Sequence, residues 1–197
     1  MVAFTILALI LGVLVGLNFD FPFIDYIVAN RDFVLYLLMF SVGISIGKHR
    51  GLINEIKKYN IKIFIIPIGI IVGSILGGYI CSFILKYNSK DCMAVASGLG
   101  WYSLAGATIN DLAGAELGSV AFISNLLREL LAFVLIPFIV KHFNEYTCIA
   151  PAGATSEDTS LPMLVKYTNP TIVVFAIFNG IVCSIMVPIL ISFFYTV

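Results

Sequence analysis

Charged side chains are scarce in this chain. Only 11% of its 197 residues are Asp, Glu, Lys or Arg, and 60% are hydrophobic, so the mean hydropathy reaches +1.06. Because a soluble domain carries about 25% charged residues, the composition predicts an integral membrane protein in contact with a lipid bilayer. The 11 basic residues balance the 11 acidic ones, which gives no indication of a nucleic acid as partner.

The sequence also lacks the motifs of common enzymes and metal sites. It has no phosphate-binding glycine loop, no HExxH or CxxC pattern and no Ser/His/Asp set. We therefore expect no enzymatic activity and no cofactor. Without ligand spacing, the cysteines are expected to be packing residues and not disulfides or metal ligands. They are Cys81, Cys92, Cys148 and Cys183.

Five hydrophobic runs predict membrane-spanning helices, since a span needs about 20 mostly apolar residues. The first run has no basic start and no small-residue cleavage site, so it is predicted to be a retained span and not a signal peptide. The expected fold class is an all-α integral membrane protein with a single transmembrane domain over residues 1–197. The predicted spans are residues 2–19, 33–47, 63–85, 116–140 and 171–195.

The loops predict the orientation of the chain. Residues 20–32 hold three aspartates, whereas residues 48–62 hold five Lys or Arg and form the only strongly basic loop. Since basic loops stay in the cytoplasm, we expect a cytoplasmic N-terminus and an external acidic loop.

Two further segments, residues 91–113 and 152–166, are hydrophobic but interrupted. The first contains the glycine-rich stretch 97–103, and the second is too short and too polar for an ordinary span. Unwound backbone at membrane depth is tolerated only where protein or a water-filled cavity covers it. Both segments could cross, as in transporters with discontinuous helices, or both could re-enter, which would put Lys141 and Lys166 on the side of the basic loop. Either way the C-terminus is expected outside.

Polar side chains inside the run 116–140 are candidates for function, because charge at that depth is costly. Glu129 is expected near the midplane, where a carboxylate can hold an ammonium group or a proton. Asn125 lies four residues before it on the same helix face, and Arg128 lies about 100° away. The alternative is that Arg128 and Glu129 only tie helices together.

The second interrupted segment carries Glu157 and Asp158. As neighbours on a helix they do not share a face, so they need not do the same work. A helix that starts near Thr155 would offer free N–H groups to an anion, although Ser and Thr before acidic residues also form an ordinary capping box. Trp101 and Tyr102 could line a pocket beside the first break or could be interface anchors.

Three ordered stretches carry a family resemblance: residues 96–104 (ASGLGWYSL), 125–130 (NLLREL) and 153–162 (GATSEDTSLP). With them, and with residues 38–47, the chain resembles the LysO-type lysine exporters. The resemblance extends over nearly the whole chain but over only the C-terminal two-thirds of a full-length member.

The resemblance implies export of L-lysine, and of its analogue thialysine, across the bacterial inner membrane in exchange for protons. It also implies a transporter bundle built from inverted repeats with two discontinuous or re-entrant helices, in which the essential acidic residues fall on Glu129 and Asp158. Full-length members carry further spans before the position of Met1. A separately encoded small membrane subunit or a homo-oligomer is therefore an expected partner.

Together, these observations predict a mechanism. Glu129 and Asp158 take the ammonium ends of lysine, backbone N–H groups at the two breaks hold its carboxylate, and protonation from outside releases it. One alternative is export of another cationic amino acid, such as ornithine or arginine. The other is a non-transporting membrane scaffold or pore subunit. The predicted substrate- and proton-binding residues are Glu129, Asp158, Asn125, Arg128, Ser97, Gly98, Gly100, Trp101, Tyr102, Ser103, Gly153 and Thr155.

Overall fold

The computed structural model of the chain describes residues 63–196 and, before them, isolated residues only (7, 11, 12, 14–16, 26, 33, 37, 40 and 44). The predicted spans 2–19 and 33–47 and the basic loop thus lie outside the continuously described part. The chain divides into two compact units, Met1–His49 and Arg50–Val197, and every helix discussed below belongs to the second.

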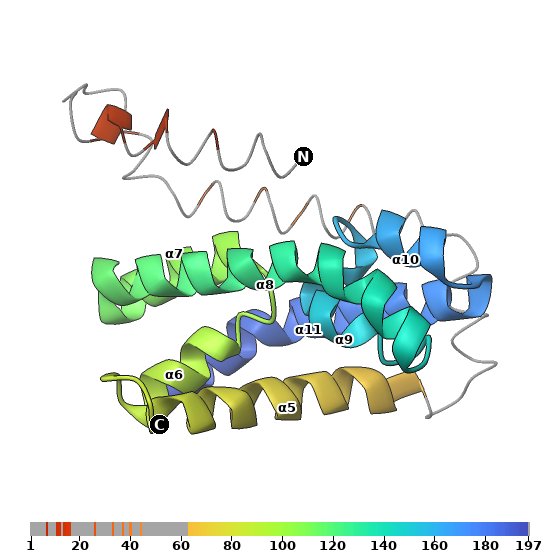
Figure 1. The fold of residues 1–197 in the computed structure, drawn as a ribbon. Helices are drawn as coiled ribbons and strands as arrows, with labels where there is room; N and C mark the ends of the chain where they lie inside the picture. The colour runs from red at the N-terminus through yellow and green to blue at the C-terminus, as the bar shows by residue number, and fades with distance from the viewer. Residues whose placement is uncertain are drawn as a thin grey trace. The chain divides into compact units, whose positions relative to one another are not determined.

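Within residues 63–196 the chain forms helices and no strand. Their order along the chain can be followed by colour in Figure 1. The helices are α5 (Ile65–Ser82), α6 (Ser89–Ala96), α7 (Tyr102–Ala113), α8 (Ala115–His142), α9 (Ile149–Ala152), the 3₁₀ helix η2 (Gly153–Glu157), α10 (Leu161–Tyr167) and α11 (Pro170–Thr196).

Three of these helices, α5, α8 and α11, are long and apolar enough to cross a membrane. They have 18, 28 and 27 residues, which at about 1.5 Å per residue is close to or above the thickness of a bilayer core. Large apolar side chains on them are exposed, including Ile65 at 68% and Val134 at 67%. Lipid solvates such a surface and water does not, so the predicted fold class, an all-α membrane protein, is confirmed.

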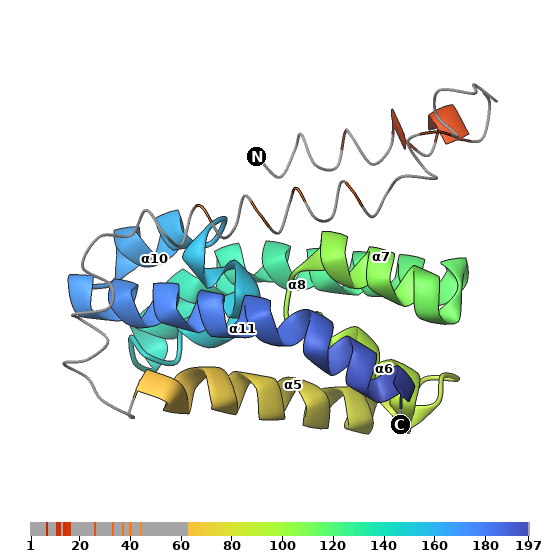
Figure 2. The ribbon, with the colours of Figure 1, turned by 180° about the vertical axis from the view of Figure 1, so that it is seen from behind.

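The first interrupted segment forms a hairpin that enters and leaves at the same end of this unit. α6 runs inward to a break at residues 97–101, and α7 runs back beside α8 (Figures 1 and 2). A hydrogen bond from Tyr87 Oη to Glu116 Oε1, 3.1 Å long, joins the α5–α6 loop to the first turn of α8. The break therefore lies inside the bundle, while both ends of the hairpin lie at its edge.

Small residues allow α7 and α8 to approach closely. A Cβ on Gly118 would lie 2.5 Å from Asn110 Cβ, and a Cβ on Gly106 would lie 2.9 Å from Phe122 Cβ. Close backbone approach at small residues is the usual way for helices to associate in a membrane. The returning arm of the hairpin is thus held against α8 along its length.

The second interrupted segment forms a hairpin from the opposite end. α9 and η2 lead inward from the end of α8, and α10 leads back to the start of α11 (Figures 1 and 2). Asn169 Nδ2 donates to Glu145 Oε2 and so joins the start of α11 to the connection after α8. At the other end of the unit, Tyr195 Oη donates to Asp91 Oδ1 over 3.0 Å. Of the two topologies that the sequence leaves open, the helices follow the re-entrant one.

Candidate substrate site

The two breaks meet inside the bundle. The backbone N–H of Ala154 donates to the carbonyl oxygen of Leu99 over 2.9 Å. Both segments use left-handed backbone at this point, with φ of 50° at Leu99, 97° at Gly100 and 57° at Gly153. Glycine adopts such angles at little cost, and a Cβ on Gly153 would overlap the Leu99 oxygen. The glycines at 100 and 153 therefore permit both the turns and the close contact between them.

Asn125 on α8 holds the first break in place. Its Oδ1 accepts from the N–H of Gly100 over 2.8 Å, and its Nδ2 donates to the carbonyls of Val95 and Ala121 over 3.0 and 2.9 Å. The side chain is only 3% exposed, and a Cβ on Gly98 would overlap it. Since both N–H donors of the amide are used within the protein, Asn125 positions the break in this structure.

Asn179 on α11 has the matching position at the second break, and the sequence analysis missed it. Its Nδ2 donates to the carbonyl of Gly153 over 2.9 Å and to Ser156 Oγ over 3.0 Å, and the side chain is fully buried. Ser156 Oγ in turn donates to the carbonyl of Ala176 over 2.7 Å. The available signal was a lone amide in the middle of the last hydrophobic run.

Glu129 is a buried carboxylate beside the second break. It is 4% exposed, and its Oε2 has no hydrogen-bond partner in the described part of the chain. The carboxyl group interacts with the Thr159 side chain and electrostatically with Asp158. Thr159 thus interacts with both of the acids that the sequence singled out. Burying a carboxylate without full pairing is costly, so this position requires a proton or a cation.

Glu157 and Asp158 point to different neighbours. Asp158 Oδ1 accepts hydrogen bonds from the backbone N–H and the hydroxyl of Thr159. Glu157 Oε1 instead accepts from Ser184 Oγ on α11 over 3.1 Å, and its Cβ packs where a Cβ on Gly180 would lie. Asp158 therefore belongs with Glu129, whereas Glu157 belongs to the contact between η2 and α11.

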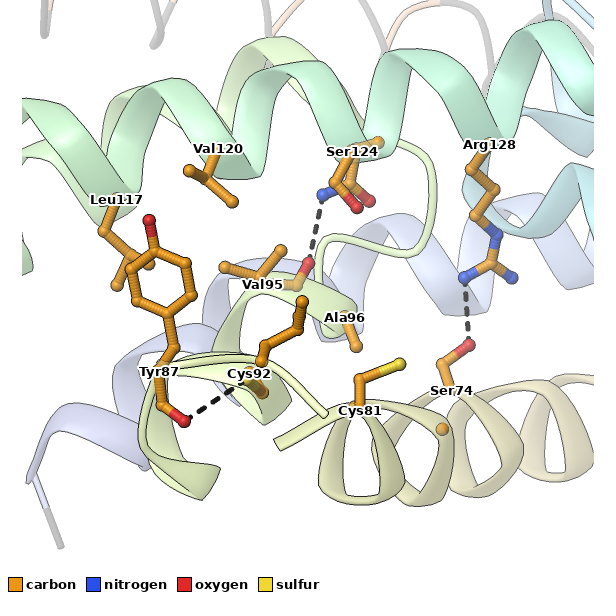
Figure 3. A pocket seen from close by; sticks show the side chains of 14 residues that line it. Ser74, Cys81, Tyr87, Cys92, Val95, Ala96, Leu117, Val120, Ser124 and Arg128 are labelled. Carbon is orange, nitrogen blue, oxygen red and sulfur yellow. Dashed lines mark hydrogen bonds between the residues drawn. The ribbon is translucent and has the colours of Figure 1, made fainter. Parts of the chain in front are cut away.

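Arg128 reaches from α8 toward α5 and α9. Its Nη1 donates to Ser74 Oγ over 2.9 Å (Figure 3), and its Nη2 and Nε donate to the carbonyls of Ala150 and Pro151 over 3.2 and 3.3 Å. Within residues 63–196 no acidic side chain forms an ion pair with it. Ser74 lies midway along α5, and a hydroxyl in the middle of a hydrophobic run was the sequence signal for this contact.

Several other predicted site groups already donate within the protein. Ser97 Oγ donates to the carbonyl of Met93 over 2.7 Å, and Thr155 Oγ1 donates to that of Ala152 over 2.9 Å. Tyr102 packs edge to face on Phe122, with ring centroids 5.1 Å apart. Trp101 and Ser103 are half-buried beside the first break.

The backbone N–H groups expected to hold a carboxylate are also paired. Those of Gly98, Gly100 and Gly153 donate to Val95 O, Asn125 Oδ1 and Ile149 O. Because these three amides already donate within the protein, their hydrogen bonds would have to open before they could bind an anion.

Comparisons with known proteins identify the family of the chain. A family model described as "Lysine exporter LysO" matches residues 6–195. The chain is 36% identical over 185 residues to "Lysine exporter LysO" of Escherichia coli (strain K12), covering 94% of this chain but 61% of that protein. It is also 33% identical over 162 residues to a protein of Haemophilus influenzae named "Putative lysine exporter", covering 82% of each chain. No solved structure matches the chain.

Proposed function

The chain belongs to the lysine exporter family LysO, and from this premise we propose that it exports L-lysine, and its analogue thialysine, across the inner (plasma) membrane of the cell. It spans 61% of the length of the Escherichia coli relative. The observation that carries the proposal is the buried Glu129 carboxylate, which has an oxygen without a partner among the described residues and interacts electrostatically with Asp158.

A cationic substrate suits this site. Glu129 presents an oxygen without a partner among the described residues, and Asp158 adds a second acidic group that interacts with it electrostatically. Positive charge stabilises a buried carboxylate such as that of Glu129, and lysine carries two ammonium groups. Glu129 and Asp158 therefore receive the ammonium ends of lysine in our proposal.

Proton exchange follows from the same chemistry. A proton that reaches one of the two carboxyl groups from outside removes the charge that holds an ammonium group, and lysine leaves. Loss of that proton to the cytoplasm restores the affinity. Hairpins that enter from opposite ends and meet at mid-depth suit alternating access to a central site, which supports antiport over a continuous pore.

The charge pattern supports one orientation. The end of α8 carries Lys141, the end of α10 carries Lys166, and both lie at the end of the unit where α5 begins after the basic stretch 48–62. Since basic segments stay in the cytoplasm, we assign this end to the cytoplasm. The N-terminus is then cytoplasmic and the C-terminus external in a multi-pass chain.

Uptake into inside-out membrane vesicles tests the function. We expect radiolabelled lysine to accumulate with saturation kinetics when the vesicle interior is acidic, and to stop accumulating when an uncoupler removes the proton gradient. Uptake without saturation or gradient dependence would indicate a pore, and the absence of uptake would indicate a scaffold. Stronger competition by ornithine or arginine than by lysine would reassign the substrate. Co-purification would show whether a small membrane subunit or a second copy accompanies the chain.

A further inference from the structure

Two cavities lie end to end along α5 and share the residues Arg128 and Ser74. The first, of about 290 Å³, lies between α5, α6 and α8 and extends to Tyr87 in the α5–α6 loop (Figure 3). The second, of about 440 Å³, extends from the same pair to Ile65 at the start of α5 and to Tyr146 after α8. A ligand that moved through both cavities would pass the Arg128 guanidinium.

The shared pair lies at mid-length in both helices. Arg128 comes 13 residues after the first residue of α8 and 14 before the last. Ser74 comes nine residues after the first residue of α5 and eight before the last. Because these helices are of membrane-spanning length, the pair lies at the depth where a central substrate site is expected.

The Arg128 guanidinium has no acidic partner among the described residues. Its three hydrogen bonds all go to neutral oxygens, and the described residues provide no carboxylate partner. Arginine has five N–H donors, so one donor on Nη1 and one on Nη2 remain after these bonds. Such a fork suits the two oxygens of a carboxylate, and a partly buried cation gains stability from a counter-ion.

Arg128 precedes Glu129 in the chain and brings a positive charge to the two cavities. Among the described residues that line the two cavities, Arg128 alone carries a positive charge. It also touches both breaks, since a Cβ on Gly153 would lie 3.0 Å from its Nη2 and a Cβ on Gly100 would lie 3.8 Å from its Cδ. Glu129, the next residue, faces Asp158 and Thr159 instead. Opposite charges thus lie on adjacent faces of α8.

We propose that Arg128 is the docking site for the α-carboxylate of the exported amino acid. The assignment rests on the proposed lysine export and separates the two ends of the substrate: the carboxylate binds the guanidinium and an ammonium group binds Glu129 and Asp158. The substrate carboxylate binds the remaining donors of Arg128 or replaces Ser74 Oγ as the acceptor of Nη1. The site therefore prefers an amino acid to the amine that has the same aminoalkyl chain but lacks the carboxylate.

The test compares lysine with cadaverine, which is lysine without its carboxylate, and with lysine methyl ester. Each compound competes against radiolabelled lysine in inside-out vesicles that carry the full chain. We expect lysine to compete roughly 10- to 100-fold better than the other two, the usual value of charge-assisted hydrogen bonds to one group. Equal competition by lysine and cadaverine in the wild-type protein would overturn the proposal without affecting lysine export itself. An absence of lysine uptake in wild type would instead remove the proposed function.

Variants then assign the preference to Arg128. The quantity compared is the lysine-to-cadaverine ratio, which is how much better lysine competes than cadaverine. Arg128→Gln should bring this ratio close to one, and Arg128→Lys should give an intermediate value. Ser74→Ala should keep or raise the ratio, because it removes an acceptor that competes for Nη1. Ser119→Ala, on the same helix with its hydroxyl bonded to Ala115 O, is the matched control. A merely structural arginine would lower the amount of folded protein and leave the ratio unchanged in every variant. If Arg128→Gln does not fold, a wild-type ratio in Arg128→Lys together with a lowered ratio in Ser74→Ala would overturn the assignment.

Discussion

The backbone N–H of Ala154 donates to the carbonyl oxygen of Leu99, 55 positions earlier in the chain. This 2.9 Å bond joins two hairpins that enter the bundle from opposite ends. In an apolar interior such a bond is stronger than in water, and it satisfies backbone groups that the breaks would otherwise leave unpaired. Movement of either hairpin alone would break this hydrogen bond, so the positions of the two hairpins are coupled.

Replacing Gly153 with alanine should separate the hairpins. The new Cβ would overlap the Leu99 oxygen, and alanine would have to adopt the left-handed φ of 57°. Strained backbone together with steric overlap should cost at least about 2 kcal/mol. We expect a clearly lower midpoint of thermal unfolding in detergent.

Gly69→Ala is the matched control for Gly153→Ala. Gly69 lies within α5, and a Cβ added there would meet no atom within 4 Å. Alanine also favours helix over glycine, so the unfolding midpoint of this variant should stay unchanged or rise slightly. A Gly153→Ala protein as stable as Gly69→Ala would mean that the two breaks are not in contact.

Loss of the Asn125 side chain should destabilise the first break. Asn125→Ala would leave the N–H of Gly100 without its partner, and the carbonyl of Val95 would keep only the N–H of Gly98. An unsatisfied buried group costs about 1–3 kcal/mol, so the free energy of unfolding should fall by about that amount. The measurement is again thermal unfolding in detergent.

Asn110→Ala provides the control for Asn125→Ala. Its amide makes only a 3.3 Å contact to the neighbouring Asp111, and the Cβ that packs against Gly118 is retained. A small change is expected here. Equal destabilisation by the two substitutions would contradict the role given to Asn125.

The breaks and the deep charges could be predicted from the sequence because their signals are local. A glycine-rich stretch inside a hydrophobic run marks unwound backbone, and Glu129 inside another run marks a costly charge. The family resemblance, carried by the same stretches, is confirmed by the match over residues 6–195. The direction of each hairpin was not predictable, since a crossing path and a returning path have the same apolar composition.

Backbone amides at the two breaks were predicted to hold the substrate carboxylate, but in the structure those of Gly100 and Ala154 donate to acceptors that are distant in the sequence. Free amides at helix starts bind anions when nothing else does, and this rule led to the prediction that the breaks hold the carboxylate. The amide of Ala154 instead finds Leu99, and that of Gly100 finds Asn125. Pairings over such separations have no signal in local sequence, which is why we propose Arg128, and not these amides, as the hydrogen-bond donor to the substrate carboxylate.

Neutralising the acids should separate the roles of adjacent residues. Glu129→Gln and Asp158→Asn remove charges that lie together, so lysine uptake should fall at least tenfold, as expected for losing about 1.4 kcal/mol or more. Glu157→Gln should retain most of the transport, because its Oε1 can still accept from Ser184 Oγ. Initial rates of uptake, normalised to the amount of folded protein, give the comparison. A Glu157→Gln protein as inactive as Asp158→Asn would place Glu157 in the charge-binding site.

Thiol labelling should distinguish one cysteine from the other three. Cys81 is exposed, whereas Cys92, Cys148 and Cys183 are buried. Burial also raises the pKa of the Cys148 thiol to about 12, so the reactive thiolate is nearly absent there at neutral pH. We expect N-ethylmaleimide to add once to the folded chain in detergent, four times after unfolding, and not at all to folded Cys81→Ser, as measured by mass spectrometry. Since Cys81 also lines the first cavity, slower labelling in the presence of lysine would place the substrate in that cavity, and labelling of folded Cys81→Ser would mean that the buried cysteines become accessible.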